Sequence, residues 1–166
     1  MAVTTDIVRT WKGPRAVMRD LLAQGRREER ALAFLMAACF VIFIAQWPRL
    51  TRKAQGFEAD AGAEVLPMSE LLTYELFAWM IIWPLLFYAV AAVSHLIARA
   101  VGGRGDAYGA RLALFWSFLA STPLALLYGL TVGLIGYGIE ANIAGAVWLL
   151  SFGVFWLQSL REAEFG

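Results

Sequence analysis

The chain has 166 residues, the length of one ordinary domain, and a formal net charge of +1. Apolar residues make up 60% of it and charged residues 16%, whereas water-soluble domains average about 45–50% and about 25%. The apolar residues form long blocks separated by short charged stretches. This pattern excludes an ordinary water-soluble domain. It predicts an all-α, polytopic helical membrane protein with about four transmembrane helices.

The N-terminal segment, residues 1–30, carries seven Arg or Lys residues and no long apolar run, so we expect no signal peptide there. Apolar residues recur in it at helical spacing, with a break at Gly13-Pro14. The pattern favours one or two short amphipathic helices on the membrane surface over a disordered tail. We expect four residues to dock this segment on the membrane: Trp11, Lys12, Arg15 and Arg19.

The first predicted span covers residues 31–48, and Arg30 and Arg49 stand at its two ends. A helix of this length reaches roughly 26 Å, just enough for the hydrocarbon core of a bilayer. The stretch that follows, residues 49–70, is polar and rich in Gly and Ala, so it is predicted to be a loop.

The second span, residues 71–98, is longer than a straight crossing needs, and Pro84 predicts a kink in it. A glycine-rich stretch, 102–105, follows. It fits no nucleotide-binding pattern, because it lacks both the G-x-G-x-x-G spacing and a Gly-Lys-Ser/Thr ending. We expect it to form a tight cytoplasmic turn, with Arg104 near lipid headgroups.

The third apolar block, residues 111–138, contains Pro123 near its middle. Two spans here would each reach roughly 20 Å, too short to cross, so one kinked helix is the better interpretation. Gly129 and Gly133 lie four residues apart, a spacing that allows close packing against another helix of this chain or against a partner.

The fourth span is predicted over residues 142–160, directly after a tight turn around Glu140. Arg161 is expected to end it, which leaves residues 162–166 as a short cytoplasmic tail. If the N-terminus lies inside, eleven of the fourteen Arg and Lys residues are cytoplasmic. Cytoplasmic segments are enriched in these residues, so both termini are predicted in the cytoplasm.

The predicted spans carry no charged residue in their deep interior, where a catalytic or transport site would need polar groups. His95 is the only histidine and Cys39 the only cysteine, so no metal-ligand set is apparent. We expect His95 to bond a backbone carbonyl or water near the interface, with pH sensing as the alternative. The sequence therefore predicts no catalytic residue, metal or cofactor, and no nucleic-acid partner or small-molecule substrate.

The stretch Thr10-Trp11-Lys12-Gly13-Pro14-Arg15, then Leu21-Leu22 and the glycine-rich turn at 102–105, resembles members of the YIP family of integral membrane proteins. The likeness extends over about residues 5–160, including the Pro123 span. It implies a polytopic membrane protein, usually with five spans where this chain shows four. The eukaryotic members bind Rab-type GTPases, and the bacterial branch implies no functional residue that can be carried over.

The arginine-rich, alanine-rich composition is typical of a GC-rich bacterial genome, so we expect a bacterial inner membrane. The favoured function is non-enzymatic: a small scaffold or accessory subunit that binds membrane lipids and another membrane protein or a second copy of itself. The alternative is an oligomeric channel or small-solute permease. No ionisable relay or inverted repeat supports that alternative in the sequence.

Overall fold

The computed structural model describes residues 3–57 and 66–166, and every regular element in these two ranges is helical. Four continuous helical stretches are long and apolar enough to cross a membrane: Glu28–Ala54, Met68–Ala100, Ala107–Leu134 and Ile139–Phe165. The predicted all-α fold with about four spans is therefore confirmed. Part of the predicted 49–70 loop, including Glu58, Asp60 and Glu64, lies outside the described residues.

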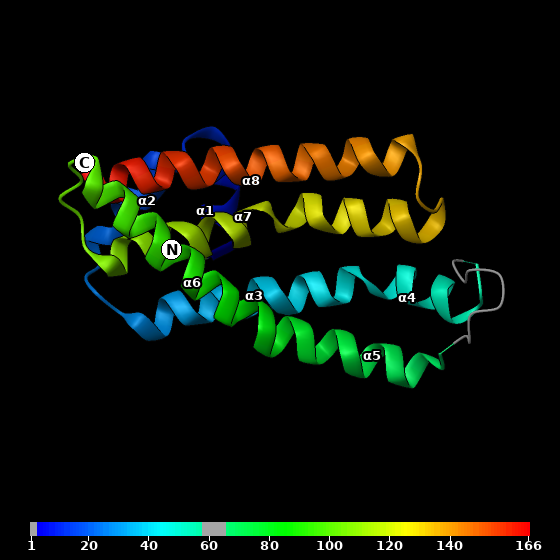
Figure 1. Ribbon diagram of the computed structural model, residues 1–166. Coiled ribbons are helices and arrows are strands. Elements are labelled where there is room, and N and C mark those ends of the chain that lie inside the picture. The colour runs from blue at the N-terminus through cyan, green and yellow to red at the C-terminus, as the bar shows by residue number, and fades with distance from the viewer. Residues whose placement is uncertain (1–2, 58–65) are drawn as a thin grey trace.

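Helix α7 (Ala107–Leu134) is the centre of the bundle, because 72% of its apolar stretch is buried, compared with 11% for α8 (Ile139–Phe165). It packs against α8 on one side and α3 (Glu28–Ala45) on the other. Figure 1 shows the C-terminus at one end of the bundle, beside the loop that precedes α7, and we call this the terminal end. The α7–α8 turn lies at the opposite, far end.

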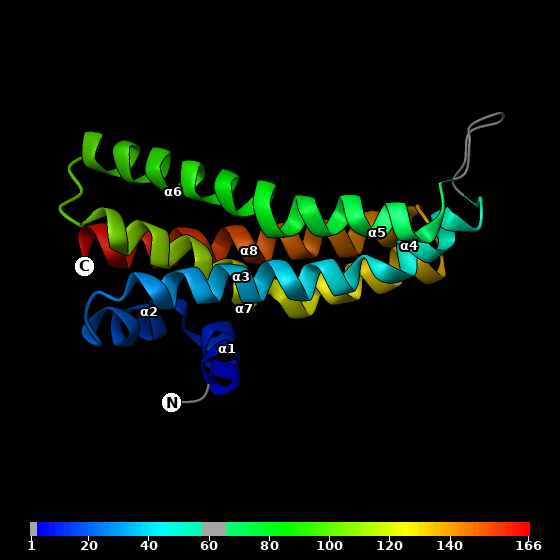
Figure 2. The same ribbon diagram turned by 90° about the horizontal axis from the view of Figure 1, so that it is seen from below.

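The second span consists of α5 (Met68–Phe77), a π-helical turn η1 (Ala78–Ile82) and α6 (Trp83–Ala100). Pro84 explains the turn, because proline donates no backbone hydrogen bond and its ring crowds the carbonyl four residues earlier. As a result α5 packs on the first span, whereas α6 crosses over α7 towards α8 (Figure 1). Seen from below, α6 diverges from the other helices towards the terminal end (Figure 2).

Several helix boundaries differ from the sequence prediction, and three of these differences are described here. Helix α4 (Trp47–Ala54) occupies the start of the predicted loop, because Pro48 lies in its first turn, where a missing N–H costs nothing. Helix α7 ends at Leu134, since Gly136 takes a left-handed conformation with φ of 98°. Helix α8 continues past Arg161 to Phe165, so the predicted tail is helical.

The N-terminal segment forms two helices, α1 (Val3–Lys12) and α2 (Pro14–Ala23), separated at Gly13 as predicted from the Gly-Pro pair. Both lie on the opposite side of the bundle from α6, and α1 runs across the bundle axis (Figures 1 and 2). The apolar face of α2 is buried in the core through Val17, Met18 and Leu21. That face therefore packs on the protein and not on a membrane surface.

Candidate functional site

A buried carboxylate joins α6 and α8 at the terminal end. Glu164, in the last turn of α8, has a fully buried side chain. Its Oε1 lies 2.6 Å from Nδ1 of His95, and its Oε2 has no hydrogen-bond partner among the described residues. The expectation of a backbone carbonyl or water for His95 was wrong. The helical extension of α8 past Arg161 brings Glu164 to α6.

The glycine-rich loop is attached to the same turn of α8. The backbone N–H groups of Arg104 and Gly105 donate to the Glu164 carbonyl, with N–O distances of 2.8 and 3.2 Å. A Cβ on Gly105 would overlap the Ala163 carbonyl, and one on Gly103 would lie 2.8 Å from the Ala98 carbonyl. These close approaches explain the glycines without any phosphate-binding role.

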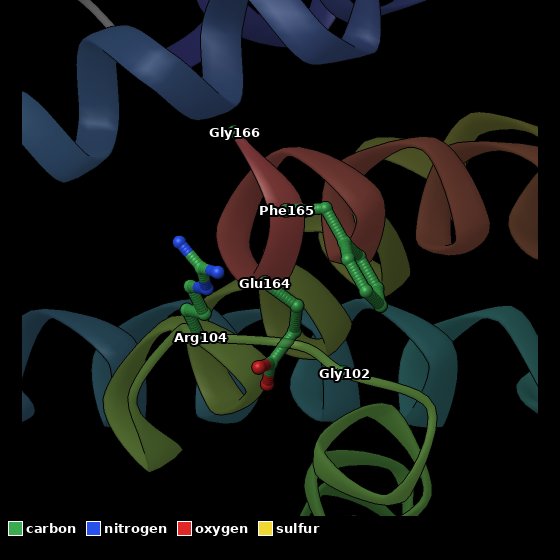
Figure 3. Close-up of a pocket in the computed structure, with 5 residues that line it drawn as sticks. All are labelled: Gly102, Arg104, Glu164, Phe165 and Gly166. Atoms are coloured by element: carbon green, nitrogen blue, oxygen red, sulfur yellow. The ribbon is translucent and has the colours of Figure 1, made fainter.

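Figure 3 shows the Glu164 carboxylate directed under this loop, while the Arg104 guanidinium points away from it. Arg104 lines an open pocket of about 340 Å³ together with Gly102, Phe165 and Gly166. Arg104, which was predicted to lie near lipid headgroups, is therefore at the terminal end with its guanidinium directed outward. Contact with lipid remains a prediction for this residue.

A second buried carboxylate, Glu162, holds α2 against α8. Its two oxygens accept from Nε of Arg15 at 3.0 Å and Nε of Arg19 at 2.8 Å. Both arginines are exposed, whereas the Glu162 side chain is almost completely buried. Two of the predicted membrane-docking residues thus form ion pairs within the protein.

The other two predicted docking residues lie at the end of α1. The Trp11 Nε1 donates to the Ala120 carbonyl at 3.3 Å, and its ring meets Phe155 of α8 edge-on, with centroids 5.3 Å apart. Lys12 is exposed. Trp11 thus ties α1 to the middle of α7 and to α8.

The polar side of α1 faces the bundle. Thr10 is buried, and its hydroxyl accepts from Nε1 of buried Trp116 at 3.0 Å. Arg9 pairs with Asp20 at 2.7 Å and Asp6 at 3.0 Å, and these bonds raise the pKa of the Arg9 guanidinium above its ordinary value. The charges near the N-terminus therefore stabilise the packing of α1 and α2.

At the far end, Gly129 and Gly133 lie where α7 crosses the first span. A Cβ on Gly129 would overlap the Ala45 carbonyl, and one on Gly133 would overlap Pro48. Nearby, Arg49 and Glu75 form an ion pair of 2.6 Å that joins α4 to α5. The two glycines thus allow close helix approach inside this chain, and no partner molecule is needed to account for them.

Between α6 and α8 the crossing helices leave an apolar cavity of about 150 Å³, which we call the lateral groove. Its lining surface carries no exposed polar area. Four residues come from α6, one from α7 and two from α8: Trp83, Leu86, Phe87, Val90, Leu114, Phe152 and Trp156.

Aromatic rings form a continuous row around the lateral groove. Trp83 stacks on Trp79 at 5.1 Å and lies 6.4 Å from Phe87. The row then passes through Phe118 of α7 to Phe152 and Trp156, with centroid distances of 4.2, 5.7 and 5.9 Å. Paired rings of this kind stabilise a fixed geometry, so the groove walls are held by contacts that link three helices.

The sequence analysis did not predict the lateral groove. The spacing of Trp83, Phe87 and Val90 places them on one face of α6, and Phe152 and Trp156 share a face of α8. What the sequence does not contain is the crossing of α6 over α7, which brings these two faces together.

The titratable groups show no metal centre. In the residues that the structure describes, no group of three or more His, Cys, Asp or Glu side chains is placed to hold a metal ion. His95 and Glu164 pair with each other, and the Glu162 carboxylate forms ion pairs with two arginines.

Comparisons of the chain with known protein families, with curated proteins and with solved structures find no match.

Proposed function

We propose that this protein is a non-enzymatic accessory component of a membrane, which binds other membrane proteins or lipids from within the bilayer. The observation that carries the proposal is the filled centre of the bundle. Residues 112–120 of α7 are all at most 5% exposed, whereas an apolar cavity, the lateral groove, opens between α6 and α8.

This arrangement favours binding at the side over passage through the molecule. A path for a polar solute would need polar or ionisable groups along the bundle axis. Here the described ion pairs between spans lie near the two ends, and Leu112, Phe115 and Trp116 fill the centre. A channel would have to run between copies of the chain.

The membrane and the orientation belong to the same proposal. We place the protein in a bacterial inner membrane with both termini in the cytoplasm, since eleven of fourteen Arg and Lys residues then lie inside. Four spans are an even number, which supports placing both termini on one side of the membrane. The proposed kinship with the YIP family rests on the N-terminal pattern and the glycine-rich turn.

The test is extraction of the full chain, expressed at native level, directly into polymer-bounded membrane discs. Mass spectrometry of the discs is expected to find a membrane protein in fixed ratio, or a lipid class enriched over the bulk membrane. A monodisperse chain with neither would contradict the proposal. Specific solute flux into liposomes containing the pure chain would favour the channel instead.

A further inference from the structure

We propose that the terminal end binds one anionic glycerophospholipid, whose phosphate lies between the ends of α6 and α8 and is held by Arg99, Arg104 and Arg161. The lipid is a phosphodiester whose headgroup carries no amine, such as phosphatidylglycerol. The inference rests on the proposed accessory function, because it names the class of lipid that the protein binds. Three observations carry it: arginines without internal partners, their positions around one pocket, and the apolar surface beside them.

The three arginines are free of the internal ion pairs that other arginines at the terminal end form. Those that are paired with carboxylates of the protein are Arg15, Arg19, Arg26 and Arg111. Arg99, Arg104 and Arg161 are exposed, and none of them forms an ion pair within residues 3–57 and 66–166. Their charges are therefore available to an external anion. Phosphate suits them, because its oxygens match the fork of N–H donors on a guanidinium.

The contact between His95 and Glu164 brings these three arginines to one place. Arg99 lies one turn after His95 on the same face of α6, and Arg161 lies one turn before Glu164 on α8. Arg104 belongs to the loop whose backbone N–H groups bind the Glu164 carbonyl, and it lines the pocket of about 340 Å³. Its guanidinium is directed away from the Glu164 carboxylate (Figure 3). The three arginines therefore stand around one pocket on three different elements.

The balance of charge around this pocket is positive. The Glu164 side chain is fully buried and contacts His95. Even with this carboxylate and one at Gly166 counted, the three guanidiniums leave an excess of positive charge. On the other side of α8, Arg15 and Arg19 share the single carboxylate of Glu162, which adds to that excess. An anionic headgroup is therefore favoured over a zwitterionic one, whose amine would be repelled.

The apolar residues near the pocket match the boundary between lipid headgroups and acyl chains. Leu96, Ile97 and Val101, at the end of α6, are between 61% and 69% exposed, and Arg99 lies among them in the sequence. At the end of a membrane span, an arginine extends its charged group to the headgroups while its apolar neighbours contact hydrocarbon. A lipid whose phosphate lies in the pocket can therefore place an acyl chain along the exposed face of α6.

The experiment is native mass spectrometry of the full chain in detergent, titrated with phosphatidylglycerol or with phosphatidylcholine of the same acyl chains. The native chain is expected to bind the first phosphatidylglycerol more tightly than phosphatidylcholine. Arg99→Gln, Arg104→Gln and Arg161→Gln should each weaken phosphatidylglycerol binding about fivefold, the worth of one basic residue at an anionic membrane surface. The midpoint of thermal unfolding without lipid should stay unchanged, because the three side chains have no described partner to lose.

Lys12→Gln is the matched control, because it removes one positive charge elsewhere on the protein. Lys12 is exposed and forms no described ion pair, but it lies on α1, on the opposite side of the bundle from α6. This variant should bind phosphatidylglycerol as the native chain does. A second arm adds glycerophosphoglycerol, the same headgroup without acyl chains. It should not displace the bound lipid at equal concentration, since the contacts with α6 are made by the acyl chains.

Three results would overturn the inference. The first is equal binding of the two lipids by the native chain. The second is a loss with Lys12→Gln as large as with the three site variants, which is the behaviour of diffuse surface charge. The third is displacement of the lipid by glycerophosphoglycerol, which would identify a soluble anion as the ligand. A protein partner found in membrane discs would still support the accessory function in each case.

Discussion

Glu162 and Glu164 are two residues apart in the final turn of α8, yet they bind different helices. Two helical positions differ by about 200° around the axis, so the two side chains point to opposite sides. Glu162 meets the arginines of α2, and Glu164 meets His95 on α6. The last turn of α8 thus connects the two elements that flank the bundle at its terminal end.

The His95–Glu164 contact should show a coupling free energy in a double-mutant cycle. His95→Ala leaves both oxygens of a buried carboxylate without a described partner, which is more costly than losing the bond alone. In the Glu164→Gln protein, His95→Ala should therefore lower the free energy of unfolding by less than it does in the native protein. We expect a coupling of about 0.5–3 kcal/mol in detergent unfolding of the four proteins. Additive effects would show that the pair contributes no interaction energy.

At the scale of single residues, the sequence was a poor guide to partners. The seven basic residues of the N-terminal segment suggest a membrane surface, but Arg15 and Arg19 bind Glu162. Arg161 suggested the end of a helix. However, Phe155, Ser159 and Glu162 share one buried face that continues past it. A charged side chain near the end of a span can extend to the membrane surface or pair with another residue of the protein. The sequence does not distinguish the two cases.

At the scale of elements, the apolar blocks predicted the spans well because lipid demands continuous helices. The glycines of α7 and the proline of the second span also predicted real packing features. The sequence does not determine the direction that α6 takes after its π-helical turn. That direction depends on contacts between distant residues, such as Phe87 with Phe118 and His95 with Glu164.

The same glycine-to-alanine substitution should change the stability of the protein in opposite directions at two positions in the spans. Gly129→Ala forces the α7 backbone away from Ala45, and overpacking of this kind costs about 1–3 kcal/mol. Gly153→Ala meets nothing within 4 Å and should stabilise α8 by about 0.5–1 kcal/mol through its better helix propensity. Thermal unfolding in one detergent checks both. Equal midpoints would contradict the close approach of α7 to the first span.

At the scale of the whole molecule, the bundle has one heavily packed end and one sparsely covered side. The N-terminal helices, α3 and α8 enclose the first half of α7, where residues 108–122 are nearly all buried. In contrast, α6 and α8 expose most of their apolar surface. A rigid centre with exposed flanking spans is suited to holding a bilayer component at its side, as the proposed function requires.

The orientation of this asymmetric bundle can be tested with its own cysteine as the control. Cys39 is the only cysteine and is fully buried, so the native chain should give little reaction with a membrane-impermeant maleimide. Ala23→Cys introduces an exposed thiol at the terminal end, and Leu66→Cys introduces one at the far end.

In intact spheroplasts the Leu66→Cys chain should be labelled, because the proposed orientation places the far end outside. The Ala23→Cys chain should react only after the membrane is opened, since eleven of the fourteen basic residues hold its end in the cytoplasm. The reverse pattern would invert the proposed orientation. Labelling of both thiols from one side would contradict the membrane crossing itself, because the two positions lie at opposite ends of the spans.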